Sequence, residues 1–278
     1  MKILISLMLL FVFSFAKDLI LVSIYPFYDV VKEISGDDFR VENLVPPKAD
    51  YHMYELTPRD LIKLYVAKVL FVSGIPLGEW ERKLERITKA RVFYLSRDID
   101  ILFYGHKELG KDPHFWVSPK RMLLVAENVK KSLEEIYPNK SFEEGYKNAY
   151  RKLKELHEAY IKTLSTCKYR SFGALHPAFG YLALDYNLKQ IVLKEGHSHG
   201  DISPGELKKL MRKIKKEKIK AVLIPKGFHS KVARILREDY GISVYEINIK
   251  IIPEKEGDNY YSIMDRNLRV LKKALKCE

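Results

Sequence analysis

Three histidines, His52, His114 and His176, stand where the sequence predicts that a strand gives way to a loop. Imidazole nitrogen is a ligand that suits zinc, and three imidazoles with one further ligand make a tetrahedral site. Wide separation along the chain is no obstacle, because ligands of open α/β proteins bind beyond the carboxyl ends of parallel strands. Spacing alone is weak support, since a single histidine is more often a surface or capping residue. The residue types nevertheless predict a transition-metal site.

Short apolar runs alternate with helical patterns along the chain, in two similar blocks. The strands expected in the first block are residues 19–25, 39–45, 69–73 and 92–95, with helices at 58–65 and 79–87. The strands expected in the second block are residues 171–175, 190–193, 221–224 and 243–247, with helices at 203–216, 231–239 and 260–276. Strands interleaved with helices imply parallel βαβ units.

One long helical pattern, about residues 142–164, separates the two blocks. Its apolar residues recur at spacings of three and four, which gives the helix one apolar face. The sequence therefore predicts an α/β protein of two lobes, each with a mainly parallel sheet flanked by helices. One long rigid helix joins the lobes, and a metal cleft lies between them. The expected boundaries are 17–138 for the N-terminal lobe, 139–166 for the linker helix and 167–278 for the C-terminal lobe.

The first sixteen residues are typical of a secretory signal peptide. Lys2 supplies the positive start, an apolar run covers residues 3–15, and cleavage is expected after Ala16. The alternative is an uncleaved N-terminal anchor. No cysteine follows the apolar run, so we expect no lipid anchor. The mature protein is predicted to be extracytoplasmic, in the periplasm or its equivalent.

The chain carries a formal net charge of +13. Its positive residues are spread over expected helix faces and mixed with glutamate, and no nucleic-acid motif accompanies them. We therefore expect no nucleic-acid partner. Cys167 and Cys277 are the two cysteines. Outside the cytoplasm they can form a disulfide; the alternative is two free buried thiols.

The strings around the three histidines carry a further signal. They read HMYELTP from residue 52, DPHFWVSP from residue 112 and HPAFGY from residue 176. With IYPFY at 24–28, ISGD at 34–37, LVPP at 44–47 and GDNYYSIM at 257–264, they closely resemble the zinc/manganese-binding proteins of bacterial ABC importers, the ZnuA/TroA-like solute-binding protein family 9. This resemblance implies that the three histidines are ligands of a metal buried between two lobes.

The resemblance also implies a function and partners. A protein of this kind is not an enzyme: it binds a divalent metal outside the cytoplasm and delivers it to the permease and ATPase subunits of an importer. We expect it to be a monomer. In the family a histidine at the third position goes with zinc and a glutamate with manganese, so His176 favours zinc, with manganese as the alternative.

The fourth ligand is where this chain departs from the family. The family usually has an aspartate there, and the matching position is Asn248, a weaker and neutral ligand. Three neutral imidazoles and an amide leave the charge of the ion uncompensated in a partly dry cleft. A water or hydroxide, a distant carboxylate, His197 or His199 are the candidates to complete the site. The alternative for the His197/His199 segment is a solvated polar loop.

The remaining histidines are weaker candidates. His106 stands in a short loop where some relatives have a long histidine-rich one, and His157 and His229 are expected to be structural. Two other functions stay open. An open fourth position at Asn248 is also a catalytic pattern, so the chain could be a zinc hydrolase, although it has no His-Glu-x-x-His string. A cleft protein for an organic solute or a metal chelate is the other alternative.

Overall fold

The computed structural model describes residues 17–104, 110–193, 203–227 and 231–278. The predicted signal peptide, residues 1–16, lies outside the described residues. His106, His197, His199 and His229 lie outside them as well. Within the described part of the chain, no helix has both the length and the apolar character that a membrane crossing requires.

The N-terminal lobe is built on a four-stranded parallel sheet. Its strands are β1 (Leu19–Val22), β2 (Arg40–Asn43), β3 (Val69–Val72) and β4 (Arg91–Tyr94), in the order β2-β1-β3-β4. The central strands β1 and β3 are apolar and buried at every position, as parallel strands covered on both faces should be. The register is set by pairs such as Ile20 with Val41 and Ile20 with Val69.

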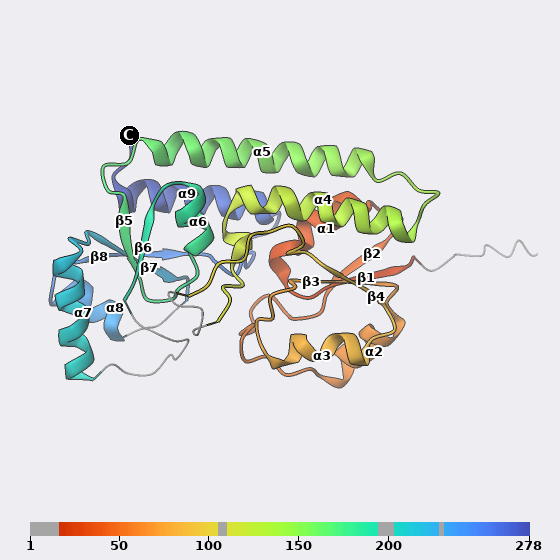
Figure 1. Ribbon diagram of the computed structural model, residues 1–278, viewed down its shortest axis with the longest axis horizontal. Coiled ribbons are helices and arrows are strands. Elements are labelled where there is room, and N and C mark those ends of the chain that lie inside the picture. Colours follow the sequence, from red (N-terminus) through yellow and green to blue (C-terminus); the bar gives the residue numbers. More distant parts are fainter. Residues whose placement is uncertain (1–16, 105–109, 194–202, 228–230) are drawn as a thin grey trace, which may run out of the picture.

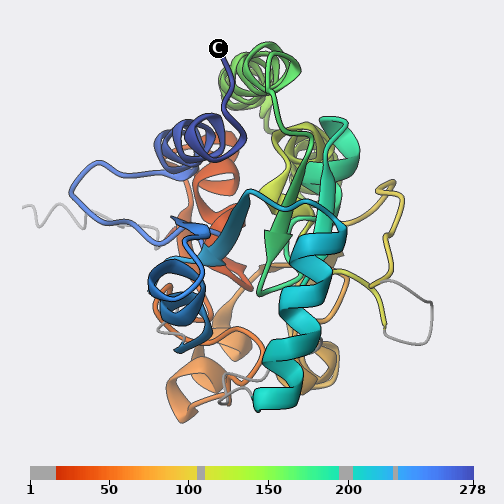
Figure 2. The same ribbon diagram turned by 90° about the vertical axis from the view of Figure 1, so that its left-hand side faces the viewer.

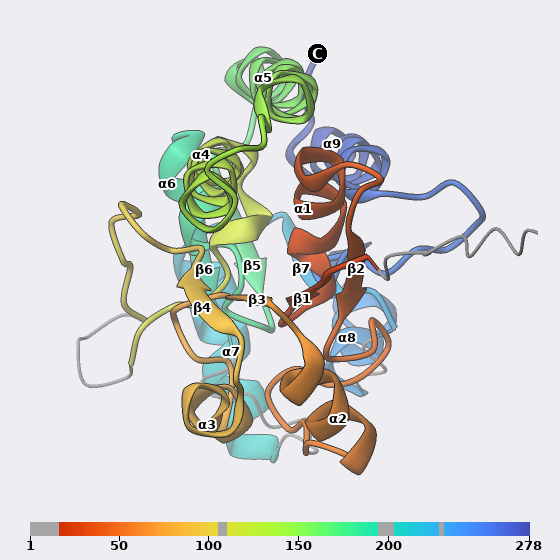
Figure 3. The same ribbon diagram turned by 90° about the vertical axis from the view of Figure 1, so that its right-hand side faces the viewer.

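Helices cover both faces of this sheet. They are α1 (Tyr28–Ser35), α2 (Pro58–Val66), α3 (Glu79–Ile87) and α4 (Pro119–Ile136), with short 3-10 turns η1 (Tyr25–Phe27) and η3 (Phe115–Val117). Figure 3 shows α1 and α4 on one side of the sheet and α2 and α3 on the other. Ser118 followed by Pro119 predicts the start of a helix, since proline fits the first turn. This prediction is confirmed, because Pro119 opens α4.

The C-terminal lobe repeats this plan. Its strands are β5 (Ser171–Ala174), β6 (Lys189–Val192), β7 (Ala221–Pro225) and β8 (Ser243–Ile247), all parallel and in the order β6-β5-β7-β8. Its helices are α6 (Gly180–Asp185), α7 (Pro204–Lys216), α8 (Lys231–Glu238) and α9 (Tyr260–Leu275). Figure 2 faces this lobe, with α7 as the cyan helix at the front.

Apolar residues alternate between the two faces of strand β7. Leu223 belongs to the core that runs through both lobes, whereas Val222 and Ile224 pack with Leu210 and Ile214 of α7 in a separate apolar cluster. The alternation follows from the two-residue repeat of a β-strand. Helices are therefore needed on both faces of this sheet, as in the N-terminal lobe.

The helix that joins the lobes is α5 (Glu143–Ser165), which runs along both lobes in Figure 1. Its buried residues Ala149, Leu153, Leu156, Tyr160 and Leu164 form one face. It packs against α1 and α4 of the first lobe and against α9 of the second. The Tyr160 hydroxyl donates to the Met264 carbonyl of α9 at 2.7 Å. The predicted two-lobed fold with one long connecting helix is confirmed; the predicted domain boundaries stay predictions.

In the second lobe, the structure settles the state of the two cysteines and corrects the start of one helix. Cys167 and Cys277 form a disulfide, which ties the end of the chain to the start of this lobe. Pro177 directly follows His176 and predicts a helix start there, but α6 begins three residues later, at Gly180. A tight turn delays it, since the Ala178 N–H donates to the His176 carbonyl at 2.9 Å.

Candidate metal centre

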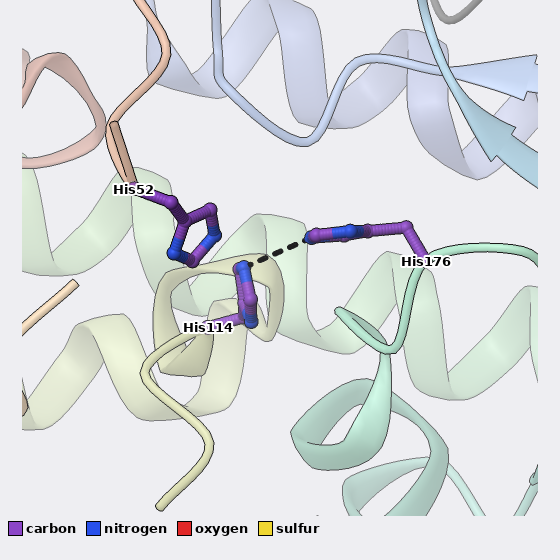
Figure 4. A group of neighbouring side chains, drawn as sticks. All are labelled: His52, His114 and His176. Atoms are coloured by element: carbon purple, nitrogen blue, oxygen red, sulfur yellow. Dashed lines mark hydrogen bonds between the residues drawn. The ribbon is translucent and has the colours of Figure 1, made fainter. Parts of the chain in front are cut away.

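The three candidate histidines meet between the lobes. A potential ligand nitrogen of each lies within 4.8 Å of those of the other two. Figure 4 shows the rings of His52 and His114, from the first lobe, and of His176, from the second, pointing toward one another. The closest pair is His114 Nε2 and His176 Nε2, 3.3 Å apart. Zinc–nitrogen bonds are about 2.0–2.1 Å long, so two ligand nitrogens of a tetrahedral zinc site lie about 3.3 Å apart, and the pair of His114 and His176 has this separation.

His114 is the most firmly held of the three. Its ring is buried, and Nδ1 lies 2.8 Å from Asp112 Oδ1 and 3.0 Å from the Tyr104 hydroxyl. The same Asp112 oxygen accepts the backbone N–H of His114 at 2.9 Å. A carboxylate at Nδ1 favours the tautomer with its proton there, which leaves the Nε2 lone pair for a metal. Burial raises the pKa of Tyr104, so its hydroxyl keeps its proton.

His52 is held by a backbone carbonyl. Its Nδ1 lies 2.9 Å from the Leu77 oxygen, in the loop that follows β3. The backbone N–H of His52 donates to Asp50 Oδ1 at 2.9 Å. Burial lowers the pKa of His52, so the neutral form that binds metals predominates at neutral pH. His52 is nevertheless more accessible than His114 or His176, both of which are buried.

The second lobe supports the first around His114. The Tyr181 hydroxyl of α6 donates to the Asp112 carbonyl at 3.0 Å and accepts the Leu102 N–H at 3.0 Å. A methyl group on Gly180 would lie 2.7 Å from Asp112 Oδ2, so a larger residue at the start of α6 would force the Asp112 carboxylate to shift. These contacts place His176, four residues before Gly180, against the segment that carries His114.

A pocket of about 310 Å³ opens at the three histidines. Its charged lining residues are Asp50, Lys226 and Lys250. Lys226 pairs with Glu254, and the Lys250 ammonium donates to the Ala49 carbonyl at 3.2 Å. A larger cavity of about 720 Å³ lies in the first lobe beside β4, and its lining includes none of the three histidines.

A family model described as zinc-uptake complex component A, periplasmic, matches residues 20–274. That range spans both lobes, the connecting helix and the three histidines. The chain belongs to this family. The family is one of solute-binding proteins, and the resemblance of the motif strings is thereby confirmed.

Named relatives agree with this membership. The zinc-binding lipoprotein AdcA of Streptococcus pneumoniae is 30% identical over 276 residues, which are 92% of this chain and 55% of the relative. This chain thus spans about half the length of the curated relatives it matches first. The Zn(II)-bound ZnuA-like domain of the same AdcA has a TM-score of 0.82 and 31% identity, over 94% of this chain and 99% of that domain. The metal-dependent lipoprotein YcdH of Bacillus subtilis gives a TM-score of 0.80 and 28% identity, over 93% of this chain and 100% of that one.

Asn248, the residue at the family's fourth-ligand position, is turned toward its own loop. Its Oδ1 accepts the Ile252 N–H at 3.0 Å, while Nδ2 donates to the Ile252 carbonyl at 2.8 Å and to Glu254 Oε1 at 3.1 Å. Its backbone N–H donates to Asn267 Oδ1 at 3.0 Å. The side chain lines a small cavity next to the histidine pocket and is absent from the lining of that pocket. Among the described histidine, cysteine, aspartate and glutamate residues, the group with metal-binding geometry consists of the three histidines.

Several residues that orient the histidines were not singled out from sequence. Asp112 had a signal, because it stands two residues before His114 in the string DPH. Tyr181 ends the string HPAFGY, whereas Leu77 gave no signal. Leu77 acts through its carbonyl, which every residue type carries, and Tyr181 acts from the other lobe. His157, expected to be structural, lies on α5 with its Nδ1 3.0 Å from the Tyr186 hydroxyl, outside the cluster.

Proposed function

We propose that this protein binds one zinc ion between its lobes outside the cytoplasm and delivers it to the permease and ATPase subunits of an ABC-type importer. The observation that carries the proposal is the convergence of His52, His114 and His176 from both lobes, with ligand nitrogens within 4.8 Å. An ion held by both lobes stabilises one arrangement of them. A permease can distinguish that arrangement from the empty one.

The donor set favours zinc over manganese. All three donors are imidazole nitrogens, and nitrogen suits zinc, whereas manganese prefers oxygen donors. The Zn(II)-bound crystal structure of the AdcA domain supports the same choice by analogy. Manganese is thus expected to bind more weakly than zinc.

The fourth ligand belongs to this proposal. Because the Asn248 amide is engaged by Ile252 and Glu254, we favour His197, His199 or a bound water over Asn248. Neutral ligands leave the charge of the zinc ion uncompensated. The Asp112 carboxylate, which contacts the His114 ring, supplies part of the missing negative charge. A zinc-edge absorption spectrum of the loaded protein counts the nitrogen and oxygen neighbours. Scattering from four imidazole rings would support a fourth histidine ligand. Scattering from three imidazole rings would support a bound water.

The remaining parts of the proposal concern export and assembly. Residues 1–16 are proposed as the signal peptide and the protein as a monomer. Some curated relatives are named lipoproteins, so the absence of a lipid anchor stays a prediction from this sequence. Mass spectrometry of the exported protein would test it by giving the mass of the mature N-terminus.

Zinc titration of the parent and of the triple variant His52→Ala/His114→Ala/His176→Ala tests the binding function. The parent should take up one zinc per chain, and the triple variant should not bind at the same concentrations. His157→Ala is the matched control, since this histidine lies outside the cluster and should leave zinc binding unchanged. Equal binding by parent and triple variant would overturn the proposal. Zinc-dependent hydrolysis of a test ester by the parent alone would favour the hydrolase instead.

A further inference from the structure

A buried carboxylate lies behind His52, one layer away from the candidate metal site. Glu81 is 6% exposed and occupies the third position of α3. Its Oε1 accepts the Ser73 N–H at 2.9 Å, and its Oε2 accepts the Leu77 N–H at 3.0 Å. The N-terminus of a helix favours negative charge, so this position suits a carboxylate. Burying it is costly unless its oxygens are hydrogen-bonded, as they are here.

These two hydrogen bonds fix both ends of the loop between β3 and α3. Inside the loop, the Ser73 hydroxyl donates to the Ile75 carbonyl at 2.7 Å and accepts the Ile75 N–H at 3.1 Å. All of the polar atoms involved are buried. Glu81 thus bonds to the first residue of the loop, Ser73, and to Leu77, which stands one residue before its end.

The same loop and the first turn of α3 contact the segment that carries His52 at three points. The Leu77 carbonyl lies 2.9 Å from His52 Nδ1. The Trp80 indole N–H donates to the Tyr51 carbonyl at 2.7 Å. A methyl group added to Gly78 would lie 2.7 Å from the His52 carbonyl oxygen, so the two backbones are in close approach. A shift of this loop would move the acceptor that orients the His52 ring.

We propose that Glu81 is a positioning residue for the metal site, which acts on His52 through the Leu77 carbonyl. By fixing the loop, it holds His52 in the tautomer with its proton on Nδ1 and presents Nε2 to the ion. This inference rests on the proposed metal binding by His52. The proposal gives a role to Glu81, a carboxylate that is not itself a ligand. Glu81 stands eight residues along the chain from Ser73, the first residue of the loop.

His52 depends on such support more than the other two histidines do. His114 has a carboxylate directly at its Nδ1, and both His114 and His176 are buried. His52 is the more accessible ring, and the Leu77 carbonyl lies at its Nδ1. Outer contacts of this kind change metal affinity by about 10- to 100-fold in other proteins.

The test is a double-mutant cycle of Glu81→Gln with His52→Ala, read as zinc affinity by competition with a chromophoric chelator. A glutamine amide can accept only one of the two N–H groups and faces the other with its own NH2. We expect Glu81→Gln to weaken zinc binding about 10- to 100-fold in the parent. In the His52→Ala background the same substitution should change it less than about twofold, since the residue it acts through is gone.

A spectroscopic readout separates positioning from mere loss of stability. Nitrogen NMR of the metal-free parent should show His52 protonated on Nδ1, and Glu81→Gln should shift it toward a mixture of tautomers. Asn128→Ala is the matched control. Asn128 is 4% exposed and donates to the carbonyls of Leu95 and Arg97, in the loop after the next strand. It should lower the melting temperature and leave both the His52 tautomer and zinc affinity unchanged.

The possible outcomes decide between the two proposals. If His52→Ala weakens zinc binding while Glu81→Gln does not, the positioning role is wrong and the metal site stands. If neither single variant changes zinc affinity, the proposed metal binding by His52 is wrong, and the positioning role has no basis. Should Glu81→Gln not fold, Glu81→Asp replaces it, since the shorter carboxylate cannot reach both N–H groups. An equal loss in the parent and in the His52→Ala background would also overturn the positioning role.

Discussion

The two lobes use one topology and carry different side chains beyond the carboxyl ends of their strands. Both sheets are parallel, with orders β2-β1-β3-β4 and β6-β5-β7-β8. The first lobe supplies two histidines, each with an acceptor at Nδ1. In the second, His176 follows β5, and Asn248, after β8, bonds to its own loop. A repeated fold thus supplies the positions, and individual side chains decide which positions become ligands.

The contacts that stabilise the two lobes near the proposed site also differ. In the first lobe, the supports come from Asp112 and from the Leu77 loop that Glu81 fixes. In the second, the end of the chain is tied to the start of the lobe by the disulfide between Cys167 and Cys277. The tests below ask whether the first lobe carries most of the binding energy.

The largest effect is expected from His114→Ala. This ring is the most buried of the three and lies closest to His176, so its removal opens the centre of the site. Zinc affinity should fall more than about a hundredfold, beyond the range seen when only outer contacts are lost. Calorimetric titration of parent and variant measures it. A larger loss in His176→Ala than in His114→Ala would reverse the comparison between the lobes.

A smaller effect is expected from Asp112→Asn. The amide keeps the shape and can still accept the His114 backbone N–H, but it contributes no charge to the ring at Nδ1. Zinc affinity should fall about 10- to 100-fold. Chelator competition measures the change, and unaltered circular dichroism controls for folding. Binding as tight as in the parent would mean that the carboxylate has no part in holding His114.

The contact between the lobes is tested by Asp29→Asn. Asp29, on α1, accepts the N–H of Tyr260 at the start of α9 at 2.7 Å. Burial raises its pKa to about 6, above the ordinary 3.8. The folded state therefore favours the protonated acid, and stability is lost as pH rises through 6. The parent should lose roughly 1–3 kcal/mol more than the variant between pH 4 and pH 7, because asparagine does not titrate.

Urea denaturation of both proteins at pH 4, 5, 6 and 7 gives this difference. Near pH 4 their stabilities should be close, and the advantage of the variant should grow with pH. A constant difference over the whole range would contradict the raised pKa. Tyr261→Phe, which removes the hydroxyl bonded to Glu33 at 2.8 Å, is a control for losing a nearby contact between α9 and α1.

The smallest effect on zinc is expected from Asn248→Ala. The amide lies outside the histidine pocket and bonds to Ile252 and Glu254. Zinc affinity should change less than about twofold, as for residues without a shared partner. Stability should fall by about 1–3 kcal/mol, because the Ile252 N–H and carbonyl lose their partner. A tenfold loss of zinc affinity would indicate that Asn248 is a ligand. Each lobe would then supply two ligands.

Much of the fold could be predicted because it depends on local patterns. Every strand predicted from an apolar run is present, and β8 (Ser243–Ile247) has the predicted limits. The connecting helix was recognisable from its apolar spacing, and its observed span, Glu143–Ser165, differs by one residue at each end. Helix α1 was not predicted, and α6 begins later than Pro177 predicts because a turn after His176 postpones it.

The sequence by itself determined the two-lobed class, the order of the elements and, through the strings around them, the three histidines. Only the tertiary structure decided what holds those histidines and where Asn248 points. The Leu77 carbonyl meets a ring 25 residues away, and Tyr181 reaches the Asp112 carbonyl from the other lobe, 69 residues away. Periodicity reports on neighbours along the chain. Contacts over such distances exist only once both sheets have packed, so no local pattern records them.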